Sequence, residues 1–196
     1  MSLPFAPASE QNKQVIHTAI ESHLGKRVLE IGSGTGQHAV YFAGLHPDIV
    51  WQTSELAENL TGVVAWIEDS GLDNLPPPTE LDVLSDWPAQ QYDMVYSANC
   101  FHIMDEPMVA ACIRGIGERL LPEGKFAVYG PFNYGGDFTA PSNAHFDQFL
   151  KSQNPTSGIK DFEWLDELAQ QAGMALLADI EMPENNRTLI WQKRTL

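Results

Sequence analysis

The feature that most constrains the fold is a glycine-rich stretch near the start of the chain, VLEIGSGTGQH at residues 28–38. The apolar residues at its start predict a buried strand over 27–31, and the residues after it predict a helix over 37–45. Between them lie Gly32, Gly34 and Gly36. Loops of this kind hold nucleotide-like cofactors, because glycine lets the backbone approach the ligand and the helix N-terminus faces it. The stretch therefore predicts a cofactor site at the carboxyl end of the first strand.

Strand-like and helix-like segments alternate along the rest of the chain. Further strands are predicted at 49–53, 79–84, 93–98, 125–129, 174–181 and 188–192, and further helices at 10–24, 57–69, from 107 onward, near 143–152 and at 161–172. This alternation predicts an α/β fold whose seven-stranded, mostly parallel sheet carries helices on both faces. The last two strands are expected to form an antiparallel hairpin around the turn at 182–186. Ligands of such sheets bind outside the carboxyl ends of the strands.

We expect one domain over residues 1–196, with a core over 25–196 and an N-terminal helix, within residues 1–24, that caps the site. Ser9 is the expected N-cap of this helix, and Gly25 is expected to end it in the left-handed conformation. The loop from Gly130 to Asn143 carries several glycines and is a candidate lid.

Charge and composition exclude several classes of partner. The net charge of -15 disfavours nucleic acid, because an acidic surface repels phosphate backbones. No apolar run is long enough to span a bilayer, and no secretory signal is visible, so neither membrane insertion nor secretion is expected. With only two cysteines, a cytoplasmic location is expected. The six histidines form no metal-binding pair, so no metal is expected. The oligomeric state does not follow from the sequence.

The spacing of the glycines separates two cofactor classes. The dinucleotide fingerprint is G-x-G-x-x-G/A, whereas this loop reads G-x-G-x-G with Gln37 where the third fingerprint glycine would stand. A bulky side chain there hinders the close approach of helix and strand. Glu30, two residues before Gly32, suits a ligand that bears an amine better than one that bears two phosphates. The loop therefore disfavours NAD.

The segment EIGSGTG, residues 30–36, resembles the first motif of class I methyltransferases that use S-adenosylmethionine (SAM). The resemblance implies SAM as cofactor and implies that Glu30, Gly32, Ser33, Gly34 and Gly36 bind it. Glu55 then corresponds to the acid that holds the ribose hydroxyls, with Glu58 as the competing choice.

The same resemblance assigns the rest of the cofactor site. Asp82, or Asp86 as an alternative, corresponds to the acid that accepts the adenine amine. Val83 and Trp87 are expected to sandwich adenine, because branched and aromatic faces stack on it. Asn99 is expected to line the methionine end.

The whole chain is also similar to a family of small class I methyltransferase-like proteins that were first catalogued as a domain of unknown function and include methyltransferase-like protein 26. The matching segments are SEQNK at 9–13, IGSGTGQHA at 31–39, ANCFHI at 98–103, YGPF at 129–132, APSNA at 140–144, Phe146-Asp147 and MPENN at 182–186. Gln11 stands where this family is expected to have Arg, and Cys100-Phe101 where it usually has Met-Ile. The similarity implies SAM binding and a Rossmann-like class I methyltransferase fold, and it implies no particular substrate.

Methyl transfer requires alignment of the acceptor with the methyl group, and a base only when the acceptor arrives protonated. The catalytic candidates are His102, Tyr129, Asn133 and His145, with Tyr134 and Asn143 nearby. Asn12 and Lys13 are candidates to fold over the site. We expect a SAM-dependent methyltransferase that acts on a small-molecule acceptor. The alternatives are a SAM-binding or interaction protein without catalysis and, less favoured, an NAD-dependent reductase.

Overall fold

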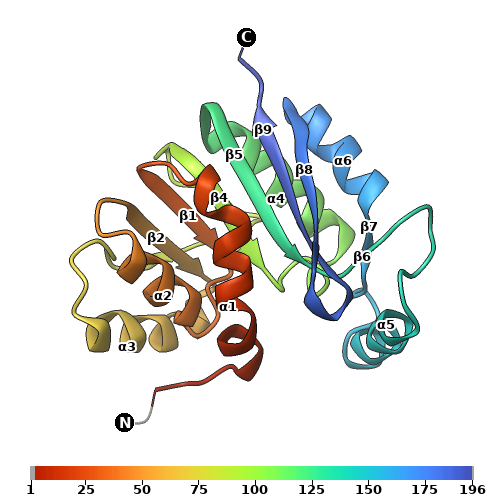
Figure 1. Ribbon diagram of the computed structural model, residues 1–196, viewed down its shortest axis with the longest axis horizontal. Coiled ribbons are helices and arrows are strands. Elements are labelled where there is room, and N and C mark those ends of the chain that lie inside the picture. The colour runs from red at the N-terminus through yellow and green to blue at the C-terminus, as the bar shows by residue number, and fades with distance from the viewer. Residues whose placement is uncertain (1–2, 196) are drawn as a thin grey trace.

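The computed structural model describes residues 3–195, which build a seven-stranded sheet in the order β3-β2-β1-β4-β5-β9-β8 (Figure 1). Neighbours from β3 to β5 are parallel, whereas β9 is antiparallel to both β5 and β8. The predicted mostly parallel sheet with a C-terminal antiparallel hairpin is confirmed. The strands are β1 Arg27–Ile31, β2 Val50–Glu55, β3 Thr79–Glu80, β4 Tyr92–Ala98, β5 Leu120–Gly130, β8 Met174–Met182 and β9 Asn186–Lys193.

Helices cover both faces of this sheet. Helices α1 (Pro7–Ile20), α2 (Gln37–Leu45) and α3 (Leu60–Ser70) pack on one face, and α4 (Glu106–Arg119) and α6 (Phe162–Gln171) pack on the other. Helix α5 (Pro141–Gln153) lies beside the turn between β8 and β9, near the carboxyl end of β5 (Figure 1). This arrangement places α1, α5 and the β8–β9 turn around the edge where the predicted ligand site lies.

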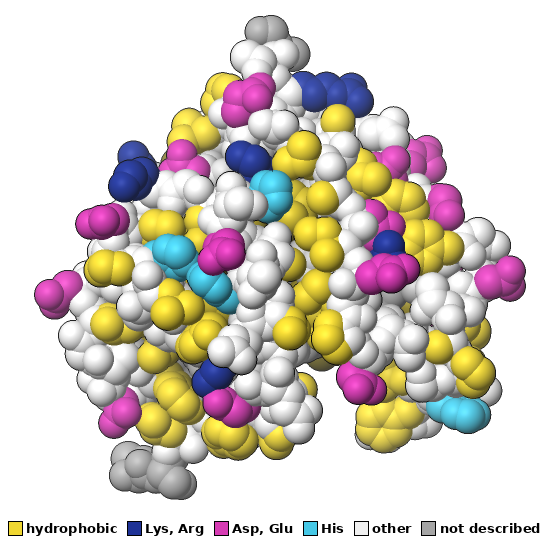
Figure 2. All heavy atoms as spheres, viewed as in Figure 1, with side chains coloured by type: hydrophobic (Ala, Val, Ile, Leu, Met, Phe, Trp, Pro, Cys, Tyr) yellow, Lys and Arg dark blue, Asp and Glu magenta, His cyan; other side chains and the backbone are white. Residues whose placement is uncertain are grey.

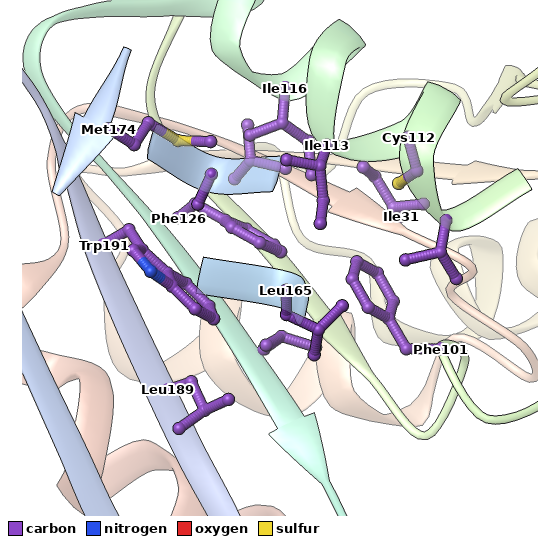
Figure 3. Packing of buried hydrophobic residues seen from close by; sticks show 14 of the residues in the cluster. Ile31, Phe101, Cys112, Ile113, Ile116, Phe126, Leu165, Met174, Leu189 and Trp191 are labelled. Carbon is purple, nitrogen blue, oxygen red and sulfur yellow. The ribbon is translucent and has the colours of Figure 1, made fainter. Parts of the chain in front are cut away.

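Successive side chains along a strand point to opposite faces of the sheet, so the hydrophobic core consists of two clusters. In β1, Val28 joins the cluster under α1 and α2, whereas Leu29 and Ile31 join the cluster under α4 and α6. On the α4 side, Phe126 and Trp191 stack with ring centroids 5.4 Å apart (Figure 3). Because both faces are buried, a central parallel strand carries apolar residues toward both, as Met94, Val95 and Tyr96 of β4 do.

The start of the chain differs from the prediction. Helix α1 begins at Pro7 with Ala6 as N-cap, so the predicted N-cap at Ser9 is wrong. Proline favours the first helical turn because its missing N–H has no partner there in any case. Gly25 is not left-handed; a Cβ at this position would lie 2.1 Å from Cβ of Asp93, so close approach explains the glycine.

Two further differences affect the site. Strand β3 has only two residues, because the chain turns at Asp82, whose Oδ1 accepts a hydrogen bond from Leu84 N at 2.9 Å. A short parallel ladder of β6 (Phe132–Asn133) and β7 (Lys160–Asp161) was not predicted from the sequence. Within residues 3–195, no helix combines the length and the apolar character needed to cross a membrane.

Candidate functional site

The glycine loop turns sharply out of β1. Gly32 has a φ of 67°, and a Cβ there would lie 2.3 Å from Sγ of Cys100, so only glycine fits. Gly34 has a φ of 58°, and a Cβ built on it would meet no atom within 4 Å, so its backbone borders open space. Ser33 fixes the loop to β2: its N donates to Ser54 O at 3.0 Å, and Ser54 N donates to its Oγ at 3.2 Å. The loop is thus rigidly held with one bare edge.

Glu55, the last residue of β2, reaches across to this loop. Its Oε1 accepts a hydrogen bond from Gly34 N at 3.0 Å, and its Oε2 accepts from Leu56 N at 2.7 Å and from Asn59 Nδ2 at 3.1 Å. The carboxylate therefore lies at the loop and is not directed into bulk water.

Two cavities meet at Glu55. One, of about 210 Å³, is mostly apolar and includes Leu81, Val83 and Met108 in its walls. The other, of about 550 Å³, runs along the glycine loop, with Ser33, Gly34 and Asn99 among its lining residues. They share five residues, which are Gly32, Glu55, Asn59, Cys100 and Ile103. Together they form one cleft, apolar at one end and polar at the other.

The apolar end agrees only in part with the predicted adenine site. Val83 lines the cavity as expected. Trp87 does not: it packs on Gly115 of α4, where a Cβ would lie 2.4 Å from its Cε2, so its predicted contact with adenine is wrong. The carboxylate of Asp82 is used in the turn at Leu84, and its contact with the adenine amine stays a prediction.

A third cavity of about 400 Å³ adjoins the polar end, and Asn99 lines both. Asn99 has a φ of 56°, and its N donates to Tyr129 O at 2.9 Å. The walls come from α1, the ends of β4 and β5, helix α5 and the β8–β9 turn, and include Gln11, Asn12, Asn99, Tyr129, Asn143, Phe146, Glu184 and Asn186. The space-filling view shows the surface notched between the start of α1 and the lobe that holds α5 (Figure 2). We call this space the acceptor cavity.

Comparison with known families identifies the chain. A family model described as "Protein of unknown function (DUF938)" matches residues 3–193. The chain belongs to the DUF938 family.

Solved structures share the fold of this DUF938 protein. They include the apo form of the SAM-dependent methyltransferase SibL (TM-score 0.82, 20% identity, 96% of this chain and 56% of that one). An O-methyltransferase family protein from Burkholderia thailandensis matches with a TM-score of 0.81 at 16% identity, over 96% of this chain and 59% of that one. Human N-acetylserotonin methyltransferase in complex with SAM matches with a TM-score of 0.79 at 17% identity, over 96% and 53%. The chain thus has the Rossmann-like class I fold of SAM-dependent methyltransferases and spans just over half the length of these structures.

Glu30 lies beneath the glycine loop of the DUF938 protein. Its side chain is buried, and Oε2 accepts a hydrogen bond from Trp51 Nε1 at 3.0 Å. Burial raises the pKa of Glu30 to about 7, although hydrogen bonds from Trp51 and Ser33 act to lower it. Glu30 is not among the residues that line the cleft, so its predicted contact with the cofactor amine stays a prediction.

A buried polar chain links the cleft to α1. The Nε2 of His38 lies 2.7 Å from Asn12 Oδ1, and its Nδ1 lies 3.3 Å from the hydroxyl of Tyr96. Burial lowers the pKa of His38 to about 4, so the ring is neutral at neutral pH. Because His38 lines the cleft and Asn12 lines the acceptor cavity, this series of hydrogen bonds holds α1 over both. Lys13 is turned away, over the ring of Tyr41.

The four predicted catalytic residues separate in the structure. Tyr129 lines the acceptor cavity, and burial raises the pKa of its hydroxyl, which therefore stays protonated at neutral pH. His102 is buried behind Phe146 with ring centroids 5.1 Å apart, and burial lowers the pKa of His102 to about 4. Asn133 is buried in β6, and His145 is exposed on α5. None of these last three lines the acceptor cavity.

Several residues of the acceptor cavity were not assigned to the site from the sequence, among them Phe146, Glu184 and Asn186. They were noticed only as parts of family-like segments. The available signal was the MPENN turn at 182–186, where a charged residue precedes two asparagines in a hairpin connection.

Proposed function

We propose that this DUF938 protein is a SAM-dependent methyltransferase that methylates a small molecule. The observation that carries the proposal is the position of Glu55, whose carboxylate meets the glycine loop at the junction of the two cleft cavities. An acid at the end of the second strand is suited to accept hydrogen bonds from both ribose hydroxyls of a nucleoside cofactor.

The residues present fit SAM. The apolar cavity around Leu81 and Val83 suits adenine, and the bare backbone edge at Gly34 suits the close approach of the methionine portion. Taken together as one cleft, the two cavities of about 210 and 550 Å³ fall within the size range of ligand pockets. When bound, SAM would supply an electrophilic methyl group for the lone pair of the acceptor, and the electron pair of the S–C bond would stay on sulfur.

The chain's own contribution is orientation and exclusion of water. Asn99 stands at the junction of the cleft and the acceptor cavity, and its backbone is held by Tyr129 O. The Tyr129 hydroxyl, protonated at neutral pH, is available to donate a hydrogen bond to the acceptor. Helices α1 and α5 shield the reacting atoms from solvent.

A strong general base is not part of this proposal. Across the described residues, the acceptor cavity is lined by no histidine, lysine or arginine. A base is dispensable when the attacking atom already has a free lone pair, as a neutral nitrogen has. Rate enhancement would then come from alignment of acceptor and methyl group.

Isothermal titration calorimetry with SAM and with its demethylated product tests cofactor binding. Transfer of labelled methyl from SAM to a metabolite extract tests catalysis. Absence of heat with either ligand at millimolar concentration would contradict the proposal. Binding without transfer would favour the alternative of a non-catalytic SAM-binding protein.

An NAD-dependent reductase remains disfavoured. Gln37, at the place of the third fingerprint glycine, is buried, and its Oε1 accepts hydrogen bonds from Ala6 N at 2.6 Å and Thr35 Oγ1 at 3.0 Å. A melting shift with NAD and none with SAM would reverse this choice. Kinship with methyltransferase-like protein 26 stays a prediction from the sequence.

A further inference from the structure

The acceptor cavity has an unusual charge composition. Its polar wall consists mainly of neutral amide and hydroxyl groups, including those of Gln11, Asn12 and Asn143. Among residues 3–195, two ionisable residues line it, Tyr129 and Glu184. Because Tyr129 stays protonated, the Glu184 carboxylate supplies the formal negative charge of the cavity. The Glu184 carboxylate makes no ion pair or hydrogen bond with any other residue in the range 3–195.

Glu184 is held in place by a constrained turn. It has φ 58° and ψ 34°, and Asn185 follows with φ 58°. Positive φ at two successive residues favours glycine or asparagine, and glutamate is unusual there. Helix α5 clamps the turn: Asn143 Nδ2 donates to Asn185 O at 3.2 Å, and Asn185 Nδ2 donates to Ser142 Oγ at 3.3 Å. A non-glycine residue with positive φ destabilises the turn, and its presence beside the cavity indicates a functional constraint.

We infer that the methyl acceptor is a small molecule with a positively charged amine, which Glu184 binds at the mouth of the acceptor cavity. This inference rests on the proposed function and adds the substrate class to it. Phe146 provides an aromatic surface in the same cavity, which suits a cation or a ring. Carboxylates and phosphates are disfavoured, because the part of the cavity wall that the structure describes offers them a carboxylate and no basic side chain.

The charged amine is the recognised group and not the methylated atom. A protonated amine has no free lone pair and cannot attack a methyl group. The methylated atom is therefore a second group of the acceptor, directed toward Asn99 and Tyr129 at the cofactor end. The preference for cations then appears in acceptor binding and leaves cofactor binding unchanged.

Three matched probes test the inference: 2-phenylethylamine (cationic), 2-phenylethanol (neutral) and phenylacetate (anionic). Each is titrated by calorimetry or ligand-observed NMR into the full chain saturated with demethylated cofactor. We expect the amine to bind roughly two- to fivefold more tightly than the alcohol, as a partly exposed ion pair provides, and phenylacetate to bind weakest. Glu184→Gln should bind the amine and the alcohol equally.

Glu68→Gln is the matched control, because Glu68 is an exposed acid on α3 and its loss changes the net charge by the same amount. It should keep the preference for the amine. Glu184→Gly, which removes the strain of the left-handed residue, should lose it, so a folding defect in Glu184→Gln cannot imitate the result. Equal binding of amine and alcohol to the unmodified chain, no amine binding at low-millimolar concentration, or equal loss in both Gln variants would overturn the inference. Failure of the demethylated cofactor to bind would instead overturn the proposed function.

Discussion

Replacing Glu55 with glutamine keeps the size of the side chain and removes one of its two acceptor oxygens. In the structure, Oε1 accepts from Gly34 N at 3.0 Å, and Oε2 accepts from Leu56 N at 2.7 Å. One of these backbone donors would then face an amide N–H. In the cofactor complex, one ribose hydroxyl would likewise lose a charged acceptor.

The magnitude follows from hydrogen bonds to a charged group. Losing one costs about 1.5–3 kcal/mol in affinity, so Glu55→Gln should weaken binding of SAM and of its demethylated product roughly tenfold to a hundredfold. Stability should fall less, by roughly 1 kcal/mol, because the site is only half-buried and water can replace the lost partner. For a chain of this size that is a decrease in Tm of about 2–4 °C.

Calorimetry with the demethylated cofactor measures the affinity, and thermal melting followed by circular dichroism measures the stability. Glu58→Gln is the control, because Glu58 also lines the cleft but is exposed. Unchanged affinity in Glu55→Gln, or an equal loss in Glu58→Gln, would refute the assignment of Glu55 to the ribose.

Three further substitutions test other parts of the site. Gly34→Ala should weaken cofactor binding, measured by calorimetry, and should lower the free energy of unfolding by about 1 kcal/mol, measured by thermal melting. The control is Gly71→Ala, because Gly71 has a similar φ (61° against 58°) and equally open surroundings but does not line the cleft. It should lose the same stability and leave cofactor binding intact. The pKa of Glu30 is raised from 4.5 to about 7, so the folded state holds its proton more tightly and stability falls as pH rises through this range. Glu30→Gln has no proton to lose, so it should avoid this decrease in stability, which is on the order of 3 kcal/mol. The melting temperature of the variant should therefore rise relative to that of the unmodified chain as pH increases from 4.5 to about 7. A difference in melting temperature that does not change with pH would contradict the burial argument. Glu184→Gly should raise stability by about 1 kcal/mol in denaturant unfolding by relieving a left-handed residue, and a decrease would show that the turn is unstrained.

The proposed cofactor half of the site could be predicted from the sequence because its determinants are local. Gly32 and Gly34 follow a buried strand at a fixed spacing, and Glu55 ends the next strand, so parallel pairing brings them together. The sequence did not determine which aromatic side chains face the cleft and which are buried in the core. Trp87 reads as an adenine-stacking residue, yet it fills a gap on α4 at Gly115, because the short strand β3 turns the chain away from the cleft.

The acceptor half was accessible only in part: Asn12, Tyr129 and Asn143 were candidates from the sequence, whereas Phe146 and Glu184 were not. Asn12, Phe146 and Glu184 are separated by long stretches of chain, and they share a cavity only because α1, α5 and the β8–β9 turn meet at one edge of the sheet. His102 and His145 are adjacent to this region in sequence, but one is buried behind Phe146 and the other faces solvent.

The sequence by itself determined the alternation of strands and helices, the parallel sheet and the glycine loop, since hydrophobic period and glycine spacing act over a few residues. Only the tertiary structure decided which polar groups face the same space, which carboxyl is desolvated and where the Glu184 carboxylate stands in the acceptor cavity. Those properties depend on packing between distant segments, and burial and electrostatic environment exist only once that packing is formed.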